Sequence, residues 1–387
     1  MIEPRLSIAT EAAQAIPASA TGILRVDLGR IAENWKALAA LVAPAHCAAV
    51  VKADAYGLGA SRVIPALAAA GCRTFFVATL AEAVAARALA PAAAILVLDG
   101  LVSGSAPDML ESGAIPVLSS LPEVEAWAAL SERRGRRNPC ALHVDTGLNR
   151  LGLSARDVHA LAGDMHALGS LDVRLVMSHL ACADDPASPK NAQQREVFDR
   201  LLPMLPSVPA SLAASDGLML GAAFHYDLVR PGYALYGGQA FGGGRTPVEA
   251  VVELHVKVLQ VRDVAPGQTV GYAASWSPTR ASRIAVIAAG YADGLFRHLS
   301  RGSDATEPSG AVAIRGKIAP IVGRVSMDLV TVDVTDIDGG VEPGELVEVI
   351  GPSLPIEALG AAAETIGYEV LTSLGRRFHR VYVGGGS

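Results

Sequence analysis

The feature that most constrains the fold is an alternation of short apolar runs with Ala- and Leu-rich segments from residue 24 to about 240. The apolar runs have the length of strands, and the segments between them carry apolar residues at helical spacing. A strand followed by a helix, repeated along the chain, is typical of parallel βα units. The predicted strands are residues 24–28, 47–53, 74–79, 94–100, 114–119, 141–146, 173–181 and 211–216, with 229–237 closing the region.

The number of strands decides between two architectures. Eight or nine strands, spaced about 25 residues apart, favour a (β/α)8 barrel. A doubly wound sheet typically has fewer strands and a G-x-G-x-x-G loop after the first one, a pattern that follows none of these strands. We therefore predict a TIM-type barrel of the α/β class.

The predicted secondary structure changes after FGGGRTP (241–247), a segment that we interpret as a hinge. Strand-like runs separated by turns then dominate, with one helical segment at 355–367 and a final strand at 376–383. We predict a mostly-β second domain. The predicted division is an N-terminal extension (1–21), a barrel domain (22–243) and a C-terminal β domain (244–387).

Composition narrows the function classes. Hydrophobic residues make up 51% and charged residues 18%, which is typical of a globular enzyme. Apolar runs stay shorter than the roughly 18 residues of a membrane span, so we expect a soluble protein without a membrane partner. A net charge of −6 argues against nucleic acid as the main partner, and the basic cluster SERRGRR (131–137) is interpreted as a solvated helix end.

The cysteines and the N-terminus add little to the prediction of function. The four cysteines lie far apart without CxxC pairs, so we expect neither a disulfide framework nor a metal site. Residues 1–20 end in a possible cleavage site, but Glu3 and Glu11 interrupt any apolar stretch. A disordered extension is the preferred interpretation over an export signal.

Polar residues at the carboxyl ends of barrel strands are the candidates for an active site, because the βα loops gather there. Lys52 directly follows an apolar run. A lysine in that position is often a surface side chain whose stem lies on apolar surface. Desolvation beside other cations instead lowers a lysine's pKa, and the neutral amine can form a Schiff base.

Other strand ends supply groups suited to an anionic cofactor. A phosphate binds to hydroxyls and to backbone N–H groups that no side chain obstructs. Several of these residues also have a purely structural interpretation: His179 as a core histidine, Ser215 as a helix cap and Arg230 as part of a turn. The candidates at these strand ends are Arg150, His179, Ser215, Arg230, Gly232 and Tyr233.

Six motifs together resemble the alanine racemases, which are fold-type III pyridoxal phosphate enzymes. They are VVKADAYGLGA, LHVDTGLNRLG, SHLACADD, DLVRPGYALYGG, GYADGLFR and IVGRVSMDLVTVDV. Their order and approximate spacing match the family from about residue 22 to 383, nearly the whole chain.

The resemblance implies pyridoxal 5'-phosphate as cofactor, bound covalently by Lys52, which then acts as one of two bases. Tyr272 is similar to the family's second base, and Arg230 to the residue that faces the pyridine nitrogen. The implied phosphate contacts include Tyr56. The remaining implied contacts are His179 to Arg230, Arg150 to cofactor and substrate, Ser215, Gly232 and Tyr233 to phosphate, Arg376 to the cofactor, and Tyr291 and Met327 to the substrate.

The chain departs from the family pattern at three positions. His143 stands where many members carry a lysine that becomes carbamylated and steadies the arginine corresponding to Arg150. We hypothesise that a chloride ion, or a hydrogen bond through His143, replaces the carbamate. Ala214 replaces an asparagine, and Ser326 replaces a cysteine beside the substrate, so strict alanine specificity is less secure than racemase chemistry.

The resemblance implies interconversion of L- and D-alanine by a homodimer with shared active sites. It also implies D-alanine supply for peptidoglycan and a cytoplasmic location. Three alternatives share the barrel: a broad-specificity racemase, a decarboxylase or aldolase, and a non-catalytic pyridoxal phosphate carrier. Arg230 argues against a decarboxylase, the lack of a metal-ligand cluster argues against an aldolase, and the β domain with Tyr272 argues against a carrier.

Overall fold

The computed structural model describes residues 16–163, 165–239, 246–300 and 310–385. Most of the predicted extension, and most of the predicted hinge at 241–247, lie outside these residues. Contacts divide the chain into two units, Ile31–Glu249 and a second unit that joins the segment up to Arg30 with the segment from Ala250 onward. Within the described residues, no helix has the length and apolarity that a membrane crossing requires.

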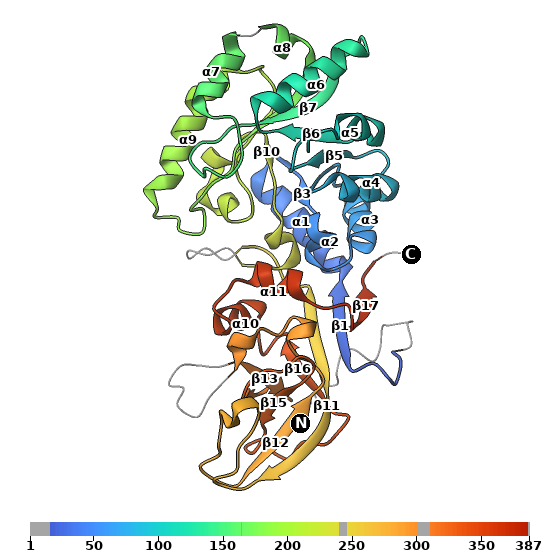
Figure 1. Ribbon diagram of the computed structural model, residues 1–387, viewed down its shortest axis with the longest axis vertical. Helices are drawn as coiled ribbons and strands as arrows, with labels where there is room; N and C mark the ends of the chain where they lie inside the picture. The colour runs from blue at the N-terminus through green and yellow to red at the C-terminus, as the bar shows by residue number, and fades with distance from the viewer. Residues whose placement is uncertain (1–15, 164, 240–245, 301–309, 386–387) are drawn as a thin grey trace. The chain divides into compact units, whose positions relative to one another are not determined.

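The first unit is built on a curled parallel sheet in the order β3-β4-β5-β6-β7-β8-β9 (Figure 1). Its predicted α/β barrel class is confirmed. The strands are β2 (His46–Cys47), β3 (Ala49–Val50), β4 (Thr74–Val77), β5 (Ala94–Val97), β6 (Ile115–Leu118), β7 (Asn138–His143), β8 (Leu171–Met177), β9 (Ala210–Ser211) and β10 (Leu228–Val229).

Strand β10 closes the ring between the last and the first strands of the sheet. It pairs in parallel with β2, and an isolated parallel bridge joins Ala214 to Arg230 on its other side. The Val50 N–H donates to the carbonyl of Pro231 at 2.9 Å, which extends the contact along β3. The predicted barrel therefore closes through short strands.

Helices cover the outside of this barrel (Figure 1). Thr79 and Glu82 form a capping box at the start of α4, a pattern written in the sequence as T-x-x-E. SERRGRR lies at the end of α6 and its residues 132–137 are exposed, as predicted. The helices are α1 (Leu28–Val42), α3 (Ala60–Ala70), α4 (Leu80–Leu89), α5 (Ala106–Ser112), α6 (Leu121–Arg133), α7 (Ala155–Gly163), α8 (Met165–Gly169) and α9 (Pro189–Leu201). The short segment α2 (Lys52–Tyr56) is a left-handed turn.

The second unit is rich in strands, as predicted, and its main sheet runs β14-β13-β16-β11-β1-β17. Strands β12 and β15 extend it through β11. The elements are β1 (Gly22–Asp27), β11 (Val252–Val264), β12 (Ser282–Ile287), β13 (Ala311–Ile314), β14 (Lys317–Pro320), β15 (Val330–Asp333), β16 (Leu346–Ile350), β17 (His379–Val383), α10 (Ile356–Ala362) and α11 (Gly367–Ser373).

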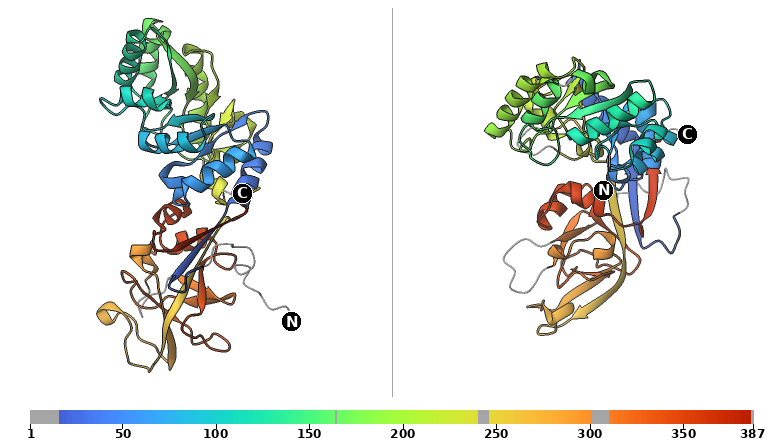
Figure 2. Two further views of the ribbon diagram at one scale, coloured as in Figure 1. Left: turned by 90° about the vertical axis from the view of Figure 1, so that its right-hand side faces the viewer. Right: turned by 45° about the horizontal axis from the view of Figure 1, so that its top comes forward.

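One strand prediction was wrong. Residues 24–28 were predicted to begin the barrel, but β1 lies in the second sheet, antiparallel to β11 and parallel to β17. Figure 2 shows β1 and β17 side by side. All but one of its residues are buried, so β1 has the apolar pattern of any central strand, and that pattern does not identify its sheet.

Substitution of Leu24 tests the burial of β1. Its side chain is fully buried, so Leu24→Ala should lower the free energy of unfolding by about 2–5 kcal/mol. Differential scanning calorimetry measures the shift in the melting transition. Leu41→Ala, the same change at an exposed leucine of α1, is the control and should shift the transition little. Equal effects of the two substitutions would contradict the buried position of Leu24.

Candidate functional site

Lys52 begins a left-handed turn at the end of the first barrel strand. The residues Ala53, Asp54, Ala55 and Tyr56 all have positive φ, between 52° and 56°, and Gly57 follows at 80°. Left-handed backbone costs non-glycine residues roughly 1–2 kcal/mol each, and four in succession are rare. Backbone strain of this kind persists only where the surroundings hold it in place, and it is concentrated at functional sites.

The surroundings of Lys52 favour its neutral amine. Burial lowers the pKa of Lys52, and the positive charge of Arg150 lowers it further, whereas Asp99 and Glu82 raise it. The two predicted site residues Lys52 and Arg150 therefore lie close enough to influence each other. A lysine held in this way is a better nucleophile and base than an exposed one.

Arg230 is a buried cation at the end of β10, only 3% exposed. Its guanidinium donates to the hydroxyl of Ser211 and to the carbonyl oxygens of Ser178 and Leu212 at 2.6 and 3.3 Å. Burial lowers the pKa of Arg230 to about 9. These acceptors fix the orientation of the guanidinium, which is a donor only.

Two histidines beside Arg230 are held neutral. His179 Nδ1 lies 3.5 Å from Arg230, and burial followed by the charge of Arg230 lowers the pKa of His179 to about 3. The same two causes, in the same order, lower the pKa of His143 to about 4. His143 Nδ1 lies 3.5 Å from the Ser119 hydroxyl. Both imidazoles are therefore uncharged at neutral pH.

Arg150 lies on the loop that follows β7. The carboxylate of Asp145 accepts the N–H groups of Gly147, Leu148 and Asn149, each at 3.0 Å, and so shapes this loop. Across the described residues, the ion pairs include none to Arg150. A chloride ion or His143 as its partner stays a prediction.

Gly232, Ser215 and Tyr56 form a backbone cradle where β10 ends. The Ser215 hydroxyl accepts the N–H groups of Gly232 and Ala234 at 3.0 and 3.2 Å. A Cβ on Gly232 would lie 2.3 Å from the Tyr56 hydroxyl, so only glycine permits this approach. Tyr233 is buried directly after it. Hydroxyls and backbone donors of this kind fit a phosphate group.

The remaining predicted residues belong to the second unit and are exposed. They are Tyr272 at 70%, Met327 at 53%, Tyr291 at 46%, and Arg376. Tyr291 and Met327 are close because the Tyr291 N–H donates to the carbonyl of Ser326, and the N–H of Ala292 donates to that of Met327, both at 3.0 Å. The two substrate-binding motifs predicted for this unit thus form one surface.

An ionic clamp holds these two motifs together. The buried carboxylate of Asp293 accepts two bonds from Arg377, at 2.6 and 2.7 Å, and a third from the Gly290 N–H at 3.0 Å. Arg377 also donates to Asp328 at 2.6 Å. Sequence reasoning missed Arg377 because its partners lie 84 and 49 residues away along the chain. It also missed Glu82, although the T-x-x-E spacing marked it.

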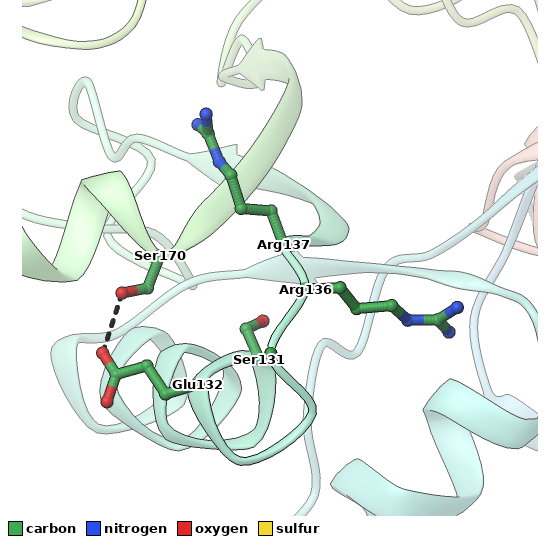
Figure 3. Close-up of a pocket in the computed structure, with 6 residues that line it drawn as sticks. Ser131, Glu132, Arg136, Arg137 and Ser170 are labelled. Atoms are coloured by element: carbon green, nitrogen blue, oxygen red, sulfur yellow. Dashed lines mark hydrogen bonds between the residues drawn. The ribbon is translucent and has the colours of Figure 1, made fainter.

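A cavity of about 190 Å³ opens elsewhere on the barrel unit (Figure 3). It lies where α6 ends and where β7 and β8 begin, so it is at the opposite ends of the strands from Lys52 and Arg230. The Ser170 hydroxyl donates to Glu132 across it at 2.7 Å. Its lining residues are Ser131, Glu132, Gly135, Arg136, Arg137 and Ser170. Its place makes it a poor candidate for the active site.

The structure thus gathers Lys52, Arg150, His179 and Arg230 at one end of the barrel, since their charges affect one another. Ser215, Gly232 and Tyr56 form the adjoining cradle. Among the described residues, no cluster of His, Cys, Asp and Glu is suited to a metal ion. This arrangement places a lysine amine with a lowered pKa at the same end of the barrel as a cradle of hydroxyls and backbone N–H groups.

Comparison with known proteins identifies the family. The family model for the alanine racemase N-terminal domain matches residues 26–240, and that for the C-terminal domain matches residues 251–382. The chain belongs to the alanine racemase family. It is therefore an isomerase, and the predicted resemblance is confirmed.

Individual relatives agree over nearly the full length. The chain is 48% identical to an alanine racemase of Rhizobium meliloti, over 95% of this chain and 98% of the relative. It is 46% identical to a catabolic alanine racemase of Mesorhizobium japonicum, over 95% of each. The crystal structure of alanine racemase from Bartonella henselae with covalently bound pyridoxal phosphate superposes with a TM-score of 0.90 at 41% identity, over 94% of this chain and 100% of that one.

Substitution of His143 tests whether its buried imidazole is neutral in the folded protein. Because its folded pKa of about 4 lies below the ordinary 6.5, the unfolded chain binds the extra proton first as pH falls. Stability should therefore decline between pH 6.5 and 4, by about 1.4 kcal/mol per unit from this group. Melting temperatures of the unchanged chain and His143→Asn across this range measure it, with His159→Asn, at an exposed histidine, as control. A slope that is the same in His143→Asn as in the unchanged chain would contradict the claim.

Substitution of Arg377 tests the ionic clamp between Arg377 and Asp293. Arg377→Ala leaves the buried Asp293 carboxylate without its two charged donors, which should lower the melting temperature and speed hydrogen exchange at the Tyr291 and Ala292 amides. Exchange is read by mass spectrometry of peptides covering residues 288–295. Arg376→Ala, the same change at the exposed neighbour, is the control. Unchanged exchange in Arg377→Ala would refute the clamp.

Proposed function

We propose that this chain is a pyridoxal phosphate dependent alanine racemase that interconverts L- and D-alanine with two bases, Lys52 and Tyr272. The observation that carries the proposal is the partly buried Lys52, whose pKa burial and Arg150 lower. Family membership and the covalently bound cofactor of the Bartonella henselae relative support it. Pyridoxal phosphate, when bound, withdraws electrons from the substrate's Cα and so stabilises the charge left by a departing proton.

Several residues of the barrel unit fit this cofactor. Lys52 would bind it covalently, and the cradle of Ser215, Gly232 and Tyr56 would hold its phosphate, with Tyr233 beside it. Arg230 would face the ring nitrogen. A guanidinium that already donates to Ser211, Ser178 and Leu212 cannot supply that nitrogen with a proton as an acid would. Arg230 would therefore leave the ring nitrogen unprotonated, which would favour return of the proton to Cα over side reactions.

Recognition of the substrate would use the barrel unit of one copy and residues of the second unit of a partner copy. Arg150 would bind the substrate carboxylate and the cofactor's phenolate oxygen. The N–H of Met327 donates to no acceptor among the described residues and could hold the same carboxylate. Tyr291 would border the substrate's side chain, and Arg376 would contact the cofactor. His179 would keep Arg230 in place through its neutral ring.

Racemisation requires proton removal from one face of Cα and proton return to the other. A single base cannot reach both faces without a large movement, so two are needed. Lys52 serves one face, and we assign the other to Tyr272, which is 70% exposed in this chain. An exposed tyrosine of this kind is available to a second copy. We therefore propose a homodimer in which each active site takes Tyr272, Tyr291 and Met327 from the partner copy.

The physiological role has two candidates. We propose that the enzyme is cytoplasmic and supplies D-alanine for peptidoglycan. One relative carries the name catabolic alanine racemase, which favours alanine breakdown as the second candidate. Deletion of the gene should impose a growth requirement for D-alanine under the first role. Under the second role it should impair only growth on alanine as carbon source.

Isotope exchange tests the division of labour. L- and D-alanine are incubated separately in D2O with the holoenzyme, and deuterium at Cα is followed by NMR. Lys52→Ala should lose exchange mainly from one enantiomer and Tyr272→Phe mainly from the other, each by about 10²-fold or more. Lys36→Ala, at an exposed lysine of α1, is the control. Equal loss from both enantiomers in both variants would refute the two-base assignment.

A further inference from the structure

A single carboxylate, that of Glu82, joins the strained turn after Lys52 to the neighbouring strand. Its Oε1 accepts the N–H of Ala53 at 2.7 Å, and its Oε2 accepts the N–H of Ala78 at 2.7 Å. Ala53 directly follows Lys52, and Ala78 directly follows β4. Glu82 thus bridges the ends of two adjacent barrel strands.

The position of this bridge matters because of the turn that it holds. Four consecutive non-glycine residues from Ala53 to Tyr56 are left-handed. The turn also has backbone bonds of its own: the Ala55 N–H donates to Val51 at 2.9 Å, the Gly57 N–H to Ala53 at 2.7 Å, and the Gly59 N–H to Asp54 at 2.9 Å. Glu82 alone among the described residues accepts the N–H at the start of the left-handed run. Ala53 is exposed, so its amide would otherwise face water.

Glu82 is itself held in place by the first turn of α4. Its N–H donates to the Thr79 hydroxyl at 3.3 Å, and the Thr79 N–H approaches Oε2 at 3.4 Å. Glu82 also acts on the amine directly, since its charge raises the pKa of Lys52 against burial and Arg150. The charged or titratable groups that bear on Lys52 are Arg150, His179, Asp99 and Glu82.

We propose that Glu82 is a positioning residue for Lys52: its carboxylate holds the left-handed turn and so sets the backbone from which the amine extends. The roles of Lys52 as base and cofactor anchor belong to the proposed function, and the expected effect of Glu82 on catalysis rests on that function. The expected effect of Glu82 on the backbone of the turn does not rest on it. Glu82 has this second task in addition to capping α4.

The structure offers a matched control for the capping task. Glu123 occupies the first turn of α6, as Glu82 does that of α4, and accepts the Ser119 N–H at 2.5 Å. It therefore joins a strand end to a helix start without touching the turn after Lys52.

The test uses Glu82→Gln in the full chain, purified free of cofactor. Glutamine keeps one acceptor oxygen but sets an NH2 donor against one of the two N–H groups, so the bridge breaks. Amide hydrogen exchange at residues 53–57 should rise at least tenfold in Glu82→Gln. Glu123→Gln should leave it within twofold. Equal exchange in Glu82→Gln and the unchanged chain, or an equal rise in Glu123→Gln, would overturn the proposal.

A second readout follows the amine itself. The rate at which Lys52 is acetylated by acetic anhydride is measured against pH by peptide mass spectrometry. Glu82→Gln should shift the midpoint to lower pH, because a negative charge that favours the protonated amine is gone. Glu82→Asp keeps the charge but is too short to bridge, so its midpoint should move less while exchange still rises. An unmoved midpoint in Glu82→Gln would count against the proposal.

The holoenzyme separates this inference from the proposed function. In Glu82→Gln, kcat for alanine should fall roughly tenfold to a hundredfold with little change in KM, as expected for a displaced catalytic group. An unchanged kcat would overturn the positioning role. Complete inactivity of the unchanged chain toward alanine would instead refute the proposed function, while the exchange and acetylation results would still decide the role of Glu82.

Discussion

The buried guanidinium of Arg230 is the constraint on which the barrel's polar end depends. A cation that is 3% exposed is tolerated only with acceptors around it, and here they come from Ser178 after β8, and from Ser211 and Leu212 at the end of β9. Arg230 therefore ties β10, which closes the ring, to its two preceding strands. Burial, and after it the charge of Arg230, lowers the pKa of His179 and of His143.

Charge and strain act together at Lys52. Burial and Arg150 lower the pKa of Lys52, while Asp99 and Glu82 raise it. The left-handed turn stores strain that a carboxylate on α4 offsets by bonding to the Ala53 amide. The same helix cap and strand end thus serve the fold and the site at once. Rigid elements therefore position the amine with precision that a free loop would lack.

Sequence reasoning found the barrel and most of the candidate site, because residues at strand ends converge whatever the side chains between them. Lys52, Arg150, His179 and Arg230 were all placed by that rule together with the family motifs. It misplaced β1, since a strand buried on both faces looks alike in either sheet. It did not find Glu82 or Arg377, whose roles depend on bonds spanning 29 and 84 residues. Neither propensity nor periodicity carries information on such pairs.

The central claim is that Lys52 forms the covalent link to pyridoxal phosphate. Borohydride reduction of the holoprotein, followed by digestion and mass spectrometry, tests it most directly because reduction makes the link permanent. The account predicts the phosphopyridoxyl adduct on the peptide containing VVKADAY, at Lys52, and no adduct in Lys52→Ala. An adduct on any other lysine of the unchanged chain, or none at all after loading, would contradict it.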